Sequence, residues 1–373
     1  MKRKPVYVQL CNLLSAGLGV NAQADPTLFP KGETDWESVY SLSQQQAVVA
    51  VAWDGLLTLP KELHPEKELF YKWFSRVVET ERANQRVNSA LQELDKLMVG
   101  EFKMPYVCLK GQGTAALYPH PQHRSCGDID FYAGRNAAKR LDTLLESHGF
   151  QIKSHSTKHS EYSYKGVDIE NHYMIALFFW LGNAWKLETL VKEWFPGGIV
   201  SRTLQQAEGS EPLTIPVAPS WFEALFSVIH FSAHLRLEGV GLRHLCDWYV
   251  LVHQPGLDID RYSQGLHLLG LAYMASAMDR LSLSLLEGKK VRLRKMEQKV
   301  EDAIWKGGNF GHHAEDAYDH AFASSGGFWR VMFRLFRHDV RRSCDFFRLA
   351  PMECLLTPLF RVAGYVRRRG GIR

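Results

Sequence analysis

The chain has 373 residues, of which 46% are hydrophobic, 12% aromatic and 23% charged. This composition is that of a folded globular protein of two or three domains, and it excludes disordered, collagen-like and low-complexity classes. The formal net charge is +5, but residues 329–373 alone carry +8, which leaves about −3 for the other 328 residues. A DNA-binding protein with a uniformly basic face is therefore not indicated.

Cysteine usage and hydropathy indicate the compartment. Six cysteines are spread along the chain without a C-x-x-C pair, which favours free thiols over a disulfide framework or a zinc knuckle. The longest apolar run, residues 173–181, is much shorter than the roughly 20 residues that a membrane-spanning helix needs. The first 24 residues resemble a signal peptide, but Gln9 and Asn12 interrupt their apolar stretch and favour an amphipathic helix. We therefore expect a cytoplasmic protein.

The first 100 residues are expected to be helical. Apolar residues recur at helical spacing near 6–14, 36–56 and 69–98, and the last of these segments has neither glycine nor proline before its end, as in a long surface helix. Short β-type runs follow at 106–109, 128–132, 162–164 and 167–173. Among them lie a helix at 136–148, ended by Gly149, and a short helix after Gly113.

Helical spacing returns beyond residue 185, notably in 220–237, 242–253, 266–286 and 295–306. The order of elements predicts an α+β protein in which a small mixed β-sheet carries helices before it and a helical bundle after it. The expected parts are an N-terminal helical region (1–100), a sheet domain (101–180), a helical domain (181–328) and a basic helical tail (329–373).

The segment Gly127-Asp-Ile-Asp-Phe131 carries two acids at alternate positions. On a strand, residues i and i+2 share a face, so Asp128 and Asp130 project together while Ile129 and Phe131 face the opposite, buried side. Two carboxylates held this close repel each other unless a cation lies between them or one takes up a proton. A divalent metal site or an acid/base role is therefore expected here.

A later strand, Val167-Asp-Ile-Glu-Asn-His172, repeats the arrangement, with Asp168, Glu170 and His172 on one face. Neighbouring strands lie roughly 5 Å apart, so pairing of the two strands would let three acids converge on one or two Mg²⁺ ions. Oxygen ligands with little nitrogen or sulfur nearby favour Mg²⁺ or Mn²⁺ over zinc.

The order of these features resembles the nucleotidyltransferase superfamily that includes DNA polymerase beta. A Lys-Gly loop follows one strand, an Asp-x-Asp pair lies on the next, and a further acid lies on a later strand. More narrowly, the chain from about 36 to 311 resembles the uncharacterised nucleotidyltransferase family. The motifs that carry this resemblance are Leu109-Lys110-Gly111, Tyr118-Pro119, Arg124, Gly127-Asp128-Ile129-Asp130, Glu170-x-His172, His230, His234, Arg243 with Asp247, residues 45–60 and Gly307-Gly-Asn-Phe-Gly311.

The resemblance implies roles for individual residues. Asp128 and Asp130 would ligate the metal that bridges the nucleotide phosphates, and Glu170 would complete a second metal site and help to activate the nucleophile, with Asp168 as its rival. Arg124 would neutralise charge on the leaving pyrophosphate. The phosphates themselves would be held by Lys110, Gly111, Gln112, Gly113 and Thr114.

The phosphate loop has two candidate registers. The superfamily usually places Gly or Ser after its glycine, whereas Gln112 follows Gly111 here. The narrower family favours Lys110-Gly111, which we place first. Gly113-Thr114 is the alternative, because it supplies a hydroxyl.

Histidines outside this constellation favour a structural interpretation. His155, His159 and His172 lack cysteine partners and a zinc-site spacing, although His172 is a candidate for a phosphate contact. His230 and His234 share a helical face, and we expect them to form a buried polar network with Arg243 and Asp247. The glycine-rich segment Gly307–Gly311 is interpreted as a turn after a helix.

In the tail, arginines at 330, 334, 337 and 341 form one helical stripe, and Phe333, Phe336 and Val340 lie to another side. Such a helix either contacts an anionic membrane, a nucleic acid or an acidic partner, or packs on its own protein through the phenylalanines. The sequence leaves both interpretations open.

We expect an Mg²⁺-dependent enzyme that moves a nucleoside monophosphate from an NTP to an acceptor and releases pyrophosphate. No segment resembles a nucleic-acid module, so the expected acceptor is a small molecule or a protein hydroxyl. A non-catalytic nucleotide-binding sensor and a membrane-surface or scaffold protein that acts through the tail are the alternatives.

Overall fold

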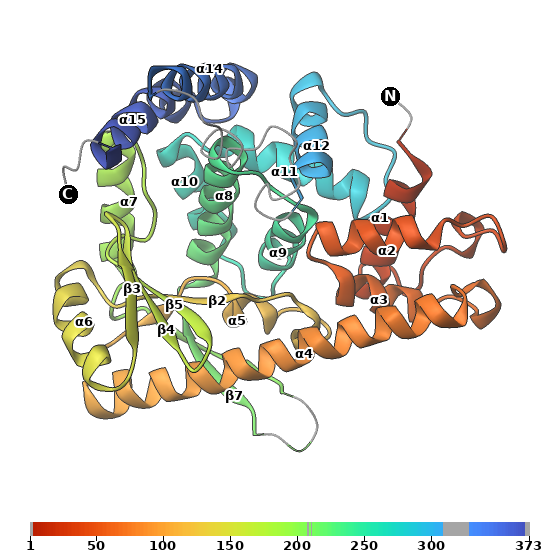
Figure 1. The fold of residues 1–373 in the computed structure, drawn as a ribbon, viewed down its shortest axis with the longest axis horizontal. Coiled ribbons are helices and arrows are strands. Elements are labelled where there is room, and N and C mark those ends of the chain that lie inside the picture. The colour runs from red at the N-terminus through yellow and green to blue at the C-terminus, as the bar shows by residue number, and fades with distance from the viewer. Residues whose placement is uncertain (1–2, 207–208, 210, 309–327, 370–373) are drawn as a thin grey trace.

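The computed structural model describes residues 3–206, 209, 211–308 and 328–369 (Figure 1). Asn309–Gly311 of the glycine-rich segment and residues 370–373 of the basic tail lie outside the described residues. The fold is α+β, as expected from the sequence. Within the described ranges, no helix combines the length and the hydropathy needed to cross a membrane.

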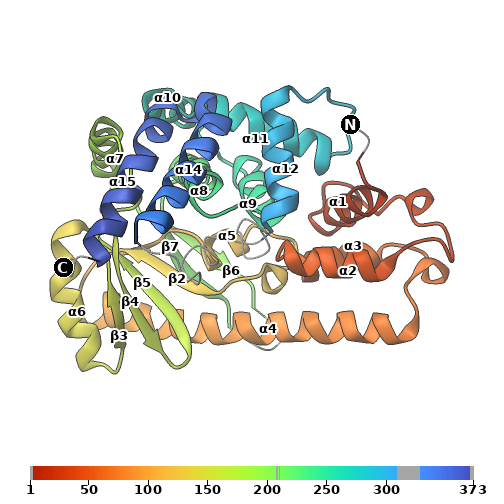
Figure 2. The same ribbon diagram turned by 45° about the horizontal axis from the view of Figure 1, so that its top comes forward.

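The N-terminal region contains three closely packed helices, α1 (Pro5–Gly17), α2 (Trp36–Gln45) and α3 (Val49–Leu57). Helices α1 and α3 pack so closely that a Cβ atom on Gly17 would lie 2.0 Å from the carbonyl oxygen of Val51. Only glycine fits at this position. The expected helical segment 36–56 is divided between α2 and α3, where Ala47 has a φ of 54°. The long helix α4 (Lys67–Asp95) continues into a π-helical turn (Lys96–Glu101) and runs under both the sheet and the N-terminal helices (Figures 1 and 2).

Seven strands of the described residues form one mixed sheet in the order β3-β4-β5-β2-β1-β7-β6. The central strands β2 and β5 are parallel, and β1 pairs antiparallel with β2 and parallel with β7. The strands are β1 (Val107–Cys108), β2 (Asp128–Tyr132), β3 (Gln151–His155), β4 (His159–Tyr164), β5 (Val167–His172), β6 (Val200–Leu204) and β7 (Leu213–Val217).

Strands β3, β6 and β7 were not expected. The sheet therefore continues past residue 180, where the sequence placed the end of the sheet domain. In β7 the sequence does alternate in the manner of a strand, and the structure buries Leu213, Ile215 and Val217 while exposing Thr214. Only the pairing with β1 shows that this segment belongs to the same sheet. Strand β3 is mostly exposed and has no such pattern.

The remaining helices cover the sheet and form the bundle. They are α5 (Gln112–Ala115), α6 (Ala138–Ser147), α7 (Leu181–Trp194), α8 (Ser220–Leu237), α9 (Leu242–Val252), α10 (Ile259–Leu269), α11 (Ala272–Leu285), α12 (Lys295–Gly307), α14 (Phe328–Phe346) and α15 (Pro351–Arg369). The expected helix 266–286 is wrong, because Gly270 takes a left-handed conformation and caps α10 before α11 starts.

The apolar interior consists of two clusters. One joins the N-terminal helices to the bundle and includes Leu13, Trp73 and Met278. The other lies between the C-terminal half of α4, the sheet and α6, and includes Leu91 and Phe131. The N-terminal helices therefore share a core with the bundle, from which the sequence analysis had separated them.

Candidate active site

The acids of β2 and β5 lie side by side because these strands pair in parallel. In this register Asp128 lies opposite Asp168, and Asp130 lies opposite Glu170. Ile129 and Phe131 point to the other side of the sheet and are buried in the core between α4 and the sheet. Burial of these two apolar side chains therefore fixes the direction of the aspartates.

Three of the four expected acids converge. One carboxylate oxygen each from Asp128, Asp130 and Glu170 lies within 4.8 Å of the other two. Ligands at about 2.1 Å from an octahedral Mg²⁺ are about 3 to 4.2 Å apart, so small side-chain shifts would bring these oxygens onto one ion. Asp168 stands apart from this group, because its carboxylate forms an ion pair with Lys153 at an exposed position. The donor set fits a hard divalent cation, and it favours Glu170 over Asp168 as the third ligand.

Lys110 provides a positive charge beside both aspartates. Its Nζ lies 3.1 Å from Asp130 Oδ2 and 3.8 Å from Asp128 Oδ2. The nearby Asp130 carboxylate raises the pKa of Asp128. Burial acts to raise the pKa of Asp130 as well, but Lys110 and His172 hold it below its usual value. Asp128 is therefore more easily protonated than Asp130.

Two histidines surround Glu170. The Nε2 atom of His172 lies 2.9 Å from Asp130 Oδ1 and 3.1 Å from Glu170 Oε2, and the Nδ1 atom of His159 lies 3.0 Å from Glu170 Oε2. Burial opposes ionisation of Glu170, but the two histidines lower its pKa far below its usual value. His172 is buried against the acids and so acts on them directly, whereas the sequence suggested a phosphate contact. His159 lies opposite His172 on β4, a pairing that the sequence did not reveal.

The loop between β1 and α5 places only part of the expected phosphate-binding segment at the site. Gly111 has a φ of 70°, which other residues rarely adopt, and it lines a pocket together with Lys110 and Thr114. The Gln112 side chain turns toward α4, where its amide group donates a hydrogen bond to Asn88. A Cβ atom on Gly113 would lie 2.8 Å from Val217 Cγ1, so this glycine packs against β7. The geometry therefore favours the Lys110-Gly111 register.

The pocket lies between the sheet and helices α8 and α9. Besides the loop residues it is lined by Arg124, Cys126, Asp128, Glu223, Phe226, Ser227, His230, Arg243, His244, Asp247 and Leu251. Its walls thus combine cationic and acidic groups with the apolar side chains of Phe226 and Leu251 from the bundle. Such a concave site with a few convergent polar groups suits a small ligand.

Arg124 is part of a buried ion pair. Its Nε and Nη2 atoms donate to the two oxygens of Asp247 at 2.7 and 2.8 Å, and Tyr118 donates to the same carboxylate at 2.7 Å. Arg243 donates to the carbonyl of Ser125 at 3.0 Å. Arg243 and Asp247 therefore reach from α9 to the loop before β2, whereas the sequence analysis expected them to form a polar network with His230 and His234.

His230 and His234 form a histidine cluster with His244, which the sequence analysis did not single out. The rings of His230 and His234 are 4.2 Å apart, and one ring nitrogen of each of the three lies within 4.8 Å of the others. Burial, with the neighbouring positive charge of Arg243, lowers the pKa of His244 well below its usual value. The Nδ1 atom of this neutral ring accepts the Gly241 N–H, so its proton is on Nε2. Imidazole nitrogens suit zinc-type ions, so this cluster fits a hard cation such as Mg²⁺ less well than the three carboxylates do.

Comparisons with known proteins identify the class. A model of the family described as "Uncharacterised nucleotidyltransferase" matches residues 32–286, about two thirds of the chain. The chain therefore belongs to this family, as the motifs indicated. Family membership indicates a nucleotidyl-transfer role in general terms.

Part of the chain is also similar to a solved structure. It is the crystal structure of an antigenic nucleotidyltransferase-like protein from Paracoccidioides brasiliensis, with 15% sequence identity and a TM-score of 0.33. The alignment covers 57% of this chain and 94% of that one. No curated protein matched the chain.

Proposed function

We propose that the protein is a nucleotidyltransferase that uses Mg²⁺ or Mn²⁺ to move an NMP from an NTP to the hydroxyl group of a small molecule or a protein, releasing pyrophosphate. The observation that carries this proposal is the convergence of Asp128, Asp130 and Glu170 from two parallel strands beside the pocket that contains Lys110.

The three carboxylates would hold the metal. When bound, the ion would neutralise phosphate charge and polarise the phosphorus centre that is attacked. Glu170 suits a ligand better than a general base, because a carboxylate with a strongly lowered pKa is a poor proton acceptor.

The pocket residues would bind and orient the nucleotide. Lys110 offers an ammonium group and Thr114 a hydroxyl on the same wall, where a phosphate would accept hydrogen bonds from both. Arg124 already shares its charge with Asp247, so we assign it the role of holding the loop before β2 in place. This replaces the pyrophosphate contact that the sequence suggested for Arg124.

Two features support a small molecule or a protein as the acceptor: the lining of the pocket and the net charge of the chain outside residues 329–373. Phe226 and Leu251 of the bundle provide apolar surface next to the charged side chains of the pocket, which suits a compact organic group. The part of the chain outside 329–373 has a slightly negative net charge, which disfavours a polynucleotide acceptor.

The test is a pyrophosphate-release assay with each NTP and Mg²⁺ or Mn²⁺, in the presence of cell-derived small molecules and proteins as acceptors. We expect turnover that disappears with a chelator. In Asp130→Asn we expect a loss of at least about 100-fold with an unchanged circular dichroism spectrum, because even residues that only support metal ligands typically contribute 10- to 100-fold.

Two outcomes would change the assignment. Tight NTP binding without pyrophosphate release from any acceptor would favour the nucleotide sensor. Full activity of Asp130→Asn would refute the metal-dependent chemistry at this site.

A further inference from the structure

The exposed apolar side chains of the protein are concentrated on one side. Of the 21 large apolar side chains that are exposed among the described residues, 14 lie either at 177–185 or on the hairpin of α14 and α15. Trp185 and Trp329 are each 72% exposed and Leu181 is 78% exposed. The hairpin lies along the upper edge of the molecule in Figure 1, with α7 beneath α15, and Figure 2 shows it in front of the helical bundle. Clusters of this kind mark interaction surfaces, whereas single exposed apolar residues do not.

Contacts hold the start of α7 against α15 and so bring the two groups of exposed side chains near each other. The carboxylate of Glu353 on α15 accepts the backbone N–H groups of Phe179 and Trp180 at 2.8 and 3.2 Å, and so caps the start of α7. The rings of Phe179 and Phe360 stack with 5.1 Å between their centroids. We call the combined surface the outer apolar face. It consists of Leu177, Trp180, Leu181, Trp185, Trp329, Phe333, Phe336, Val340, Phe347, Met352, Leu355, Leu359, Phe360 and Val366.

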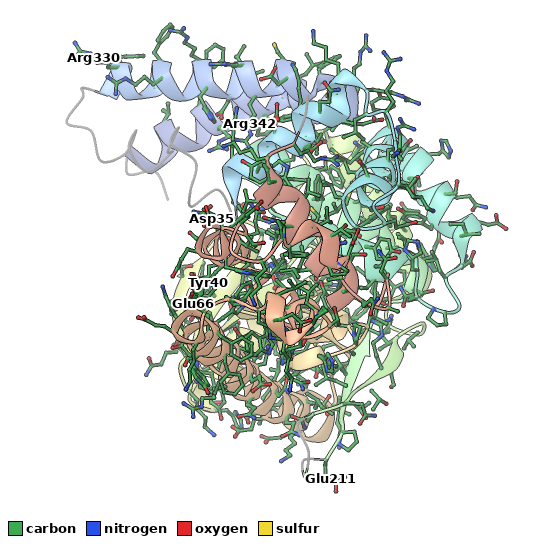
Figure 3. All side chains as sticks on the ribbon, turned by 90° about the vertical axis from the view of Figure 1, so that its right-hand side faces the viewer. Asp35, Tyr40, Glu66, Glu211, Arg330 and Arg342 are labelled. Carbon is green, nitrogen blue, oxygen red and sulfur yellow. The ribbon has the colours of Figure 1, made fainter. Side chains whose placement is uncertain are left out.

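The arginines of the hairpin divide into two groups. Arg342 and Arg361 point inward and donate to the carbonyl oxygens of Leu235 and Leu237 on α8 at 2.8 and 2.9 Å. Arg330, Arg337 and Arg341 are exposed and follow helical spacing next to the apolar stripe of α14. Figure 3 shows Arg330 at the outer end of α14 and Arg342 nearer the rest of the molecule.

The acids of the hairpin do not neutralise the exposed arginines. Asp339 is buried and lies 3.3 Å from Arg361 Nε, Glu353 is buried against the start of α7, and Asp345 pairs with Lys299 of α12. The three acids of this segment are thus used in internal contacts. The outward surface of α14 therefore presents aromatic side chains beside Arg330, Arg337 and Arg341, whose charges these three acids do not offset.

We propose that the outer apolar face docks on an anionic phospholipid surface, with α14 lying in the interfacial plane. Aromatic and aliphatic side chains beside a row of arginines are the features with which amphipathic helices bind such surfaces. Negatively charged headgroups complement the exposed arginines, while the tryptophans suit the boundary between headgroups and acyl chains. Docking of this kind does not depend on the proposed nucleotidyl transfer.

The test is co-sedimentation of the full chain with vesicles of phosphatidylcholine, with or without roughly 30 mol% phosphatidylglycerol. We expect strong binding to anionic vesicles at about 50 mM salt, weak binding to neutral vesicles, and loss of binding as salt rises toward about 500 mM. In Arg330→Gln/Arg337→Gln/Arg341→Gln the vesicle affinity should fall on the order of 100-fold, since each arginine near the surface contributes roughly fivefold. In Trp329→Ser/Phe333→Ser it should fall at least about tenfold.

A matched control is available on α4, which lies across the molecule from α14 (Figure 1). Its exposed Tyr71, Arg82 and Arg86 are changed together to Ser, Gln and Gln, and vesicle affinity should remain within about twofold of the parent. The arginine variant removes only exposed charges, so its circular dichroism spectrum and its rate of pyrophosphate release should equal those of the parent. It therefore tests the proposal even if the aromatic variant misfolds.

The proposal is overturned if the parent does not sediment with anionic vesicles at low salt, or if the α4 control loses as much affinity as the arginine variant. It is also overturned if the α14 variants convert a dimer into a monomer in analytical ultracentrifugation without changing vesicle binding. That outcome would assign the face to a second copy of the chain.

Discussion

Asp168 and Glu170 differ by two positions on one strand, yet they meet different surroundings. Glu170 lies with Asp128 and Asp130 and contacts two histidines, whereas Asp168 pairs with Lys153 near the surface. A shift of two residues along the strand therefore separates a candidate metal ligand, Glu170, from a residue in a surface ion pair, Asp168. Surface pairs contribute only about 0 to 1 kcal/mol.

From this contrast we predict that Glu170→Gln loses at least about 100-fold in pyrophosphate release, because a ligand charge is removed. Asp168→Asn should stay within about threefold of the parent. Steady-state kinetics at saturating Mg²⁺ measures both, with circular dichroism as the check on folding. The reverse ranking would move the third ligand to Asp168.

His123 provides a second prediction at the residue scale. Its Nδ1 atom lies 2.8 Å from both oxygens of Asp54 on α3, and its Nε2 atom lies 3.0 Å from Glu81 on α4. Only the protonated ring donates from both nitrogens. Burial acts to lower the pKa of His123, but the two carboxylates raise it above its usual value.

Because the folded pKa is raised, the stabilisation by His123 is complete below the unfolded value of about 6.5 and is lost as pH rises through the folded pKa. We predict that His123→Gln lowers the free energy of unfolding by about 1.5–3 kcal/mol near pH 6 and by less near pH 9. Urea unfolding at a series of pH values measures this. Equal losses at both pH values would show that the ring acts through packing alone.

At the scale of elements, Arg202 connects three segments around the site. From β6 it donates to the carbonyl oxygen of Gly113 in α5 at 2.9 Å, to both oxygens of Glu223 on α8 at 2.8 and 2.7 Å, and to Gln254 at 2.8 Å. The loop that carries Lys110 and Gly111 is thus held by a strand that joins the sheet late in the chain.

We predict that Arg202→Met lowers the free energy of unfolding by about 3–5 kcal/mol, because Glu223 would remain buried without its partner. Urea unfolding should show most of this loss restored in Arg202→Met/Glu223→Leu. Arg135→Met, at an exposed position, serves as the control and should change stability by less than about 0.5 kcal/mol. Failure of the double variant to recover stability would mean that the bond to Gly113 matters more than the ion pair.

At the scale of the whole molecule, the pocket joins parts with different cores. Its walls come from the sheet side and from α8 and α9, and the buried pair of Arg124 and Asp247 crosses the same boundary. A ligand in this pocket would therefore stabilise the arrangement of the sheet against the bundle, not one element alone.

We predict that Mg²⁺ with a non-hydrolysable NTP raises the thermal unfolding midpoint, since a ligand at 100 times its Kd adds about 2.7 kcal/mol to the free energy of unfolding. Differential scanning calorimetry measures the shift, which EDTA should abolish and Asp130→Asn should reduce to near zero. A shift of equal size in Asp130→Asn would place the nucleotide elsewhere.

The sequence by itself determined the local part of this protein. Alternation along a strand placed Asp128 and Asp130 on one face and Ile129 and Phe131 on the other, and uninterrupted helical spacing identified α4 and α8. The family motifs also sufficed to identify the nucleotidyltransferase class. These features depend on neighbours within a few residues, which the chain order shows directly.

Only the tertiary structure decided which distant side chains meet. The parallel register of β2 and β5 placed Glu170 opposite Asp130, the pairing of β4 with β5 brought His159 to Glu170, and the approach of α9 engaged Arg124 with Asp247. The addition of β6 and β7 to the sheet likewise joined segments about 100 residues apart, because Cys108 pairs with Val217. Such pairings are set by burial and strand register over the whole fold, and a single sequence carries no local signal for them.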